Sequence, residues 1–144
     1  MLYSFRFYLS WIVSAILMYG AFYIWHGVFL NDLNSITFPK VIFLGLAALV
    51  YLAISFVLYR TYESKIFNKL FFYPMIRGIA SGFFIGFLLF SFVTVLGISF
   101  TKNVNLTYIL ADCAWQIVEQ IIGGLIIALG KIMIFEQNHD IIHD

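Results

Sequence analysis

The chain has 144 residues, of which 63% are hydrophobic and only 10% are charged, with a formal net charge of +1. Soluble domains contain about 45–50% apolar and about 25% charged residues, so this composition excludes an ordinary water-soluble domain. The near-neutral balance provides no basic stripe for nucleic acid, so we expect no nucleic-acid partner. A single cysteine, Cys113, excludes an intrachain disulfide. No linker-like segment divides the chain, which indicates one domain over residues 1–144.

Four apolar runs follow one another along the chain, and each has about the 20 residues that a helix needs to cross a bilayer. They predict transmembrane helices over about residues 8–30, 41–59, 75–100 and 107–131. Pro39 and Pro74 each stand near the start of a predicted helix, where a missing N–H costs little. The sequence therefore predicts an all-α, polytopic integral membrane protein whose four transmembrane helices form a compact bundle.

Basic residues predict the orientation, because cytoplasmic loops of membrane proteins carry an excess of lysine and arginine. Two basic residues, Lys40 and Lys102, fall on one side of the predicted membrane. The other side carries Arg6, Arg60, Lys65, Lys69, Arg77 and Lys131. We therefore expect both termini in the cytoplasm, and a multi-pass position in a cell membrane such as the bacterial inner membrane. The basic and aromatic segment around Ile66–Tyr73 either lies among the inner headgroups or is a short loop with interfacial anchors.

Glycines recur at every fourth position of the third predicted helix, at Gly78, Gly82 and Gly86. This spacing places them on one helix face, where small residues let another backbone approach closely. Gly124 on the fourth predicted helix is a natural counterpart. The glycines fit either packing within the chain or a homodimer seam, and we favour packing within the chain. The second predicted helix carries no charge, so we expect it to be the most exposed to lipid.

Polar residues gather on the fourth predicted helix within the stretch ADCAWQIVEQIIGG. Asp112, Gln116 and Glu119 fall on one face, with Trp115 at its edge and Gln120 one residue away. Charged groups inside a membrane nearly always face the bundle interior or a watery cavity. We therefore expect this polar stripe to point inward.

Depth within the membrane suggests which side chains meet. With a rise of about 1.5 Å per residue, Glu119 falls near the middle of the bilayer and Asp112 near its outer boundary. His26, on the first predicted helix, falls at about the depth of Asp112, so the two are expected to pair if their helices are neighbours. Asp32 follows just outside.

The same outer region contains two tryptophans. Trp25 stands beside His26, and Trp115 beside Gln116. They belong either to an aromatic belt or to the lining of a pocket, to which Asp32 and Gln120 are further candidates.

Glu119 has no cation at its predicted depth, which favours its neutral form. Such a carboxyl group is either the proton-binding site of a carrier or a hydrogen-bonding contact between helices. A metal site usually needs three or four ligands, and one intramembrane histidine does not supply them. We therefore expect no metal and no cofactor.

A further indication comes from the order of motifs in the C-terminal half. Arg77-Gly78 is followed by Gly82 and Gly86, by the loop TKNVNLTY, and by Asp112 with Trp115 three positions later. This order resembles small bacterial four-helix membrane protein families of unknown function. The resemblance implies a topology and no activity.

Three functions fit these features. The first is a proton-coupled carrier or channel subunit that acts as an oligomer. The second is a structural or accessory membrane protein whose polar stripe docks a partner helix. The third is a membrane enzyme that handles a lipid or quinone, although the sequence has no catalytic signature and so favours a non-enzymatic role. The partners we expect are the lipid bilayer and either a second copy of the chain or another membrane protein.

Overall fold

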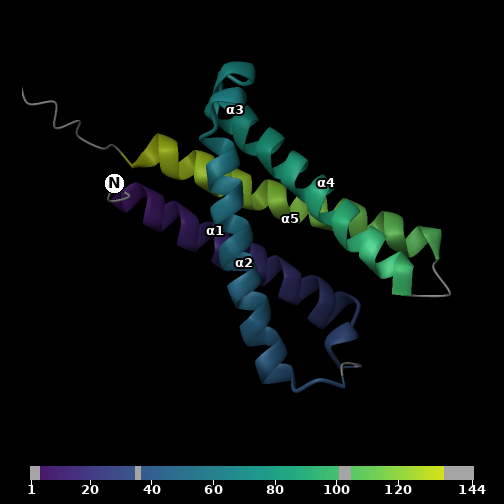
Figure 1. Ribbon diagram of the computed structural model, residues 1–144. Helices are drawn as coiled ribbons and strands as arrows, with labels where there is room; N and C mark the ends of the chain where they lie inside the picture. Colours follow the sequence, from purple (N-terminus) through teal and green to yellow (C-terminus); the bar gives the residue numbers. More distant parts are fainter. Residues whose placement is uncertain (1–3, 35–36, 101–104, 135–144) are drawn as a thin grey trace, which may run out of the picture.

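The computed structural model describes residues 4–34, 37–100 and 105–134. This part of the chain is helical, with no strand among the described residues. In chain order the helices are α1 (Phe5–Tyr23), η1 (Ile24–Phe29), η2 (Asp32–Asn34), α2 (Lys40–Tyr62), α3 (Lys65–Leu70), α4 (Pro74–Phe100) and α5 (Leu106–Met133), as Figure 1 shows.

Within the described residues, four segments are long and apolar enough to cross a membrane, in agreement with the four predicted helices. They cover Phe5–Phe29, Lys40–Tyr62, Pro74–Val95 and Leu106–Met133. The first predicted helix is less regular than its apolar run indicated, because the α-helix ends at Tyr23 and continues as the π-helix η1. A π-helical turn is rare and often marks a functional position.

Short polar residues fix where the helices begin. The Ser4 hydroxyl accepts a hydrogen bond from the Phe7 backbone N–H before α1, and the Asn105 side chain accepts one from Thr107 before α5. Pro39 precedes α2, and Pro74 is the first residue of α4, where the absent N–H has no helical partner to lose. Local sequence therefore accounts for these boundaries.

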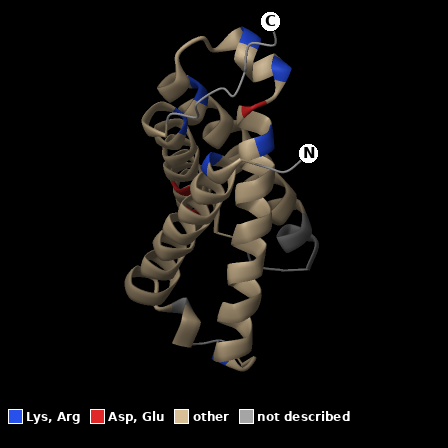
Figure 2. Cartoon of the chain, turned by 90° about the vertical axis from the view of Figure 1, so that its left-hand side faces the viewer, with Lys and Arg blue, Asp and Glu red and all other residues tan. Residues whose placement is uncertain are grey.

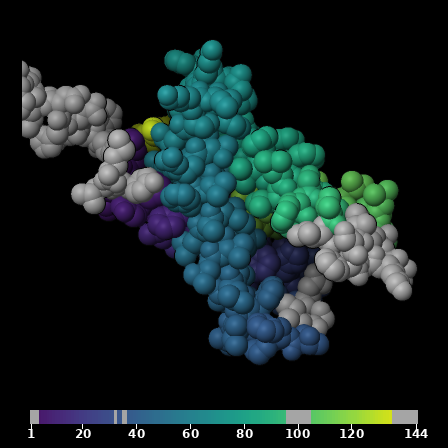
Figure 3. Space-filling model, in the orientation of Figure 1, coloured from purple at the N-terminus to yellow at the C-terminus, as the bar shows by residue number. Residues whose placement is uncertain are grey.

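The helices are arranged as a close antiparallel pair, α4 and α5, with α1 packed along α5 (Figure 1). α2 packs mainly on α1 and crosses over α5 at a steep angle (Figure 1). In the space-filling view of Figure 3, α2 runs down the front of the molecule and α4 lies to one side of it.

Glycines allow the close approach of α4 to α5. A β-carbon on Gly78 would lie 2.5 Å from the backbone oxygen of Gly124. One on Gly86 would lie 2.8 Å from the α-carbon of Ile117. No side chain fits between backbones at these distances, so the predicted glycine face lies within the chain, between its third and fourth spans.

Hydroxyl and indole groups connect the remaining helices. Ser14 of α1 donates to the backbone oxygen of Gly123 on α5, at 3.2 Å. Ser55 of α2 donates to the oxygen of Trp11 at 2.8 Å, and the Trp11 indole donates to the oxygen of Leu52, also at 2.8 Å. These bonds use backbone oxygens that already accept within a helix, so they join helices without leaving a donor unpaired.

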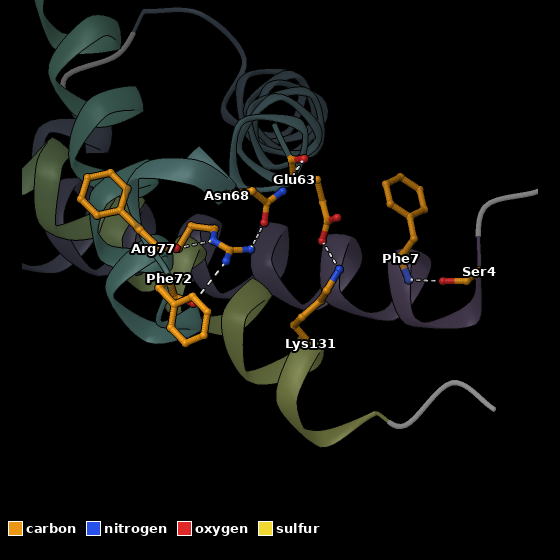
Figure 4. Close-up of polar contacts among 8 residues, drawn as sticks. Ser4, Phe7, Glu63, Asn68, Phe72, Arg77 and Lys131 are labelled. Atoms are coloured by element: carbon orange, nitrogen blue, oxygen red, sulfur yellow. Dashed lines mark hydrogen bonds and ion pairs between the residues drawn. The ribbon is translucent and has the colours of Figure 1, made fainter. Parts of the chain in front are cut away.

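Basic residues gather at one end of the molecule, around the start of α1, the end of α2, helix α3 and the end of α5 (Figure 2). Lys40 stands at the opposite end, and Lys102 lies outside the described residues. At the basic end Lys131 forms an ion pair of 2.5 Å with Glu63, joining the end of α5 to the α2–α3 connection (Figure 4). The two charge-bearing side chains are about one third exposed, so solvent screens this pair.

Candidate functional site

A buried carboxyl group stands at the centre of the molecule. Glu119 is residue 14 of the 28 in α5, and only 1% of its surface is exposed. A carboxyl group at the middle of a membrane-length helix is expensive to bury, and such groups usually mark a functional position. This makes Glu119 the first candidate for chemistry.

The partner of Glu119 is the hydroxyl group of Tyr51. The two side chains interact, and the Tyr51 hydroxyl lies within reach of a hydrogen bond to the Glu119 carboxyl group. Tyr51 is residue 12 of the 23 in α2, so both groups stand at the midpoint of a span. Within the described residues, Tyr51 is the titratable group that contacts this carboxyl, and no cation does. The contact between the carboxyl and hydroxyl groups therefore lies in an apolar setting.

One oxygen of this carboxyl group has no recorded partner. Glu119 Oε1 is buried and accepts no hydrogen bond from any described residue. Most buried polar atoms in proteins are paired, and an unpaired one calls for an explanation such as a functional role or a bound water. The Glu119 carboxyl group therefore keeps one oxygen, Oε1, that can still accept a hydrogen bond.

Sequence analysis missed Tyr51, because its helix carries no charge and was expected to face lipid. α2 does have the smallest buried share of the four spans. Even so, Tyr51, Ser55 and Leu58 are buried. Tyr51 and Ser55 are four residues apart and so lie on one helix face. Polar residues at this spacing in an apolar helix were the available signal.

Gln120, next to Glu119, is also fully buried. Its β-carbon faces Gly86 of α4, so it belongs to the α4–α5 contact. Both polar atoms of its amide lack a recorded partner among the described residues. The centre of α5 therefore holds two adjacent side chains with unused hydrogen-bonding capacity.

Burial along the predicted polar stripe increases from the outer end of α5 toward its centre. Asp112 is exposed, Gln116 is half-buried and Glu119 is buried. The expectation that the whole stripe points inward therefore fails at Asp112, which lies on the exposed surface of α5.

The structure does not bring His26 and Asp112 together as an ion pair within the described part of the chain. The half-buried His26 ring lies 5.0 Å from the ring of Phe22, measured between centroids. Phe22 in turn lies 5.5 Å from Tyr51. Phe22 thus contacts both His26 and Tyr51, and its phenyl ring carries no exchangeable proton.

Trp25 of η1 and Trp115 of α5 stack on each other, with centroids 4.5 Å apart and ring planes 11° apart. The two indole rings therefore face one another directly and join η1 to α5. Both indole nitrogens are buried without a recorded partner in the described structure. The side chain of Asp32, a further pocket candidate, lies outside the described part.

Among the described residues, no three His, Cys, Asp or Glu side chains gather in a way that would hold a metal ion. The chemistry that the site offers is proton binding. A carboxylate at Glu119 accepts a hydrogen bond from the Tyr51 hydroxyl, whereas a protonated Glu119 donates one itself. A change in protonation therefore changes the hydrogen-bonding pattern between α2 and α5.

Comparisons with known proteins add no family. No family model, no curated protein and no solved structure matches this chain.

Proposed function

We propose that this protein is a small proton-coupled carrier or channel subunit in which Glu119 binds and releases the proton. The observation that carries the proposal is the burial of Glu119 beside Tyr51, at the midpoints of two membrane-length helices. A reversible proton site at this depth is what a membrane relay needs. The unused Glu119 Oε1 provides the position at which a water molecule or substrate group would deliver the proton.

The orientation that we propose has both termini in the cytoplasm, and the membrane is that of a cell such as the bacterial inner membrane. The basic side chains at the end formed by α3, the start of α1 and the ends of α2 and α5 support it. Four helices enclose little space for a solute, so the working unit is an oligomer. We also propose that this chain belongs to a family of small bacterial four-helix membrane proteins.

The test uses purified protein in liposomes that contain a pH-sensitive dye, with a pH difference across the membrane. Wild type is expected to move protons, and Glu119→Gln to abolish this flux, because glutamine has nearly the same shape and binds no proton. Tyr51→Phe is expected to reduce the flux. The matched control is Tyr19→Phe, which removes a hydroxyl that donates to the Leu44 oxygen and joins α1 to α2, away from the carboxyl group. Equal loss in both tyrosine variants would count against the proposal.

A second candidate function rests on Asp112. This side chain is exposed on a membrane-length helix, where a charge facing lipid is unfavourable. A partner helix that covers Asp112 would make this chain an accessory subunit. Asp112→Asn is then expected to change the mass of the complex extracted in mild detergent, whereas Glu119→Gln is not. If wild type moves no protons and Asp112→Asn alone breaks a complex, the accessory function holds instead.

A further inference from the structure

Polar side chains continue the Glu119 face of α5 in one direction only. Gln116, three residues before Glu119, is half-buried, and Asp112, a further turn away, is exposed. Both lie toward the start of α5, which is the end of the molecule away from the basic residues. Exposure thus rises in steps from the buried carboxyl group toward this end.

In the other direction, apolar side chains from two helices meet over α5. Met18 of α1 and Leu58 of α2 both contact Gly123, which lies one turn beyond Glu119 toward the basic end. A β-carbon on Gly123 would overlap the Met18 sulfur atom and would lie 2.9 Å from Leu58 Cδ2. Met18 and Leu58 are both completely buried. The glycine therefore makes room for an apolar contact of three helices, which we call the Met18–Leu58 layer.

The burial continues from this layer toward the basic end. Ile127, one turn beyond Gly123 on α5, is only 1% exposed. Tyr62, one turn beyond Leu58 on α2, is completely buried and belongs to the same apolar cluster as Ile127, Leu58 and Met18. Two successive turns of α2 and α5 thus present buried side chains on the basic side of Glu119.

A fixed cation lies at the end of this buried stretch. The Arg77 guanidinium group lies over the Tyr62 ring, 5.3 Å from its centroid. Arg77 also donates to the backbone oxygens of Phe71 at 3.1 Å and Phe72 at 3.4 Å, and to the Asn68 side chain (Figure 4). An arginine held in place near a narrow passage raises an electrostatic barrier to protons and cations.

The serine hydroxyl groups near the layer do not bridge it. Ser14 donates to the backbone oxygen of Gly123 at 3.2 Å, and Ser55 donates to that of Trp11 at 2.8 Å. Each donor is held by a helix oxygen and must leave that bond before it can pass a proton on. The described residues therefore offer Glu119 a polar approach from the end away from the basic residues, and an apolar barrier on the other side.

We propose that Glu119 exchanges its proton with the side of the membrane away from the basic end, and that the Met18–Leu58 layer is the gate that closes the opposite way. Apolar constrictions close passages in membrane proteins by excluding water. This inference rests on the proposed function, because it assigns the direction from which the proton of Glu119 is reached. Gln116 lies on the open side of the gate and Ile127 on the closed side.

The experiment measures water access with single cysteines and a membrane-impermeant thiol reagent, applied to bacterial cells and to inverted membrane vesicles. The native cysteine is first removed by Cys113→Ala. The reagent attacks the thiolate, which forms in contact with water. Lys69→Cys, on the exposed surface of α3, reports which side the basic end faces. Gln116→Cys is expected to react only from the opposite side, and Ile127→Cys from neither side.

Opening the gate is the second arm of the experiment. Leu58→Ala, combined with Ile127→Cys, is expected to produce a reaction from the side on which Lys69→Cys reacts. The matched control is Val57→Ala, which shortens the neighbouring, half-exposed side chain of the same helix and should leave Ile127→Cys unreactive. If Leu58→Ala does not fold, the comparison of Gln116→Cys with Ile127→Cys still decides the proposal, since both keep the gate intact.

The proposal is overturned if Gln116→Cys reacts from the same side as Lys69→Cys or from neither side. It is also overturned if Ile127→Cys reacts with the gate intact, or stays unreactive in a folded Leu58→Ala protein. Thiol labelling does not depend on proton transport. A Glu119-dependent flux with the wrong labelling pattern would therefore refute the gate alone, whereas the expected labelling without any flux would refute the proton function alone.

Discussion

Gly82 of α4 faces the backbone of Gln120 on α5 so closely that a β-carbon on Gly82 would overlap the Gln120 backbone oxygen. The same stretch of α5 carries Glu119, which points toward α2 instead. The backbone contact with α4 thus holds the carboxyl site in position from behind. Loosening this contact should disturb the site as well as the fold.

Gly82→Ala is expected to lower the free energy of unfolding by about 1–3 kcal/mol, because the added methyl group forces two helix backbones apart. The control is Gly45→Ala on α2, where an added β-carbon meets nothing within 4 Å. Thermal unfolding in detergent, followed by circular dichroism, measures both. A Gly82→Ala protein as stable as Gly45→Ala would show that α4 and α5 are not in backbone contact.

The stacked pair of Trp25 and Trp115 should show energetic coupling. Aromatic pairs contribute about 0.5–1.5 kcal/mol beyond the area they bury. We expect a double-mutant cycle of Trp25→Leu and Trp115→Leu to give a coupling energy of that size. The cycle of Trp11→Leu with Trp115→Leu should be additive, because Trp11 lies near the opposite end of the first span and contacts α2. Coupling in the second cycle equal to the first would contradict the assigned stack.

Arg77→Lys should loosen α3 without unfolding the protein. Lysine keeps the charge but lacks the planar fork that reaches two backbone oxygens and the Asn68 side chain. Hydrogen exchange of the backbone amides over residues 65–71 is expected to quicken in this variant. Arg60→Lys is the matched control, since Arg60 is exposed and no recorded hydrogen bond uses its side chain. Unchanged exchange in Arg77→Lys would mean that α3 is held by its apolar side chains alone.

The sequence predicts the fold at the level of composition and spacing. Length and hydropathy predict four membrane-length helices. The four-residue spacing of Gly78, Gly82 and Gly86 predicts a face that packs closely on another helix. Both features can be predicted because each depends on the sequence of a single helix. The crossing of α2 over α5 was not predictable, since it depends on how apolar surfaces fit together. The π-helix η1 was not predicted either, because no proline or glycine pair marks its start at Ile24.

The candidate site was predicted in part. Glu119 stands out because a carboxyl group in an apolar helix is rare. Tyr51 did not stand out, because tyrosine is common in membrane helices and its partner comes from 68 positions further along the chain. The pairing of His26 with Asp112 followed from depth alone. Depth fixes the level of a residue in the membrane and leaves open which way each helix face turns.

The central claim is that Glu119 exchanges a proton inside the membrane. Infrared difference spectroscopy of the protein in lipid, as the pH is changed from about 5 to about 9, follows the carbonyl stretch of protonated carboxyl groups directly. We predict a band that disappears reversibly as the pH rises, that is absent in Glu119→Gln, and that shifts in Tyr51→Phe through loss of the hydrogen bond. A Glu119 band that stays constant over this whole range would contradict the claim, because a carboxyl group that never exchanges its proton serves only to hold α2 against α5.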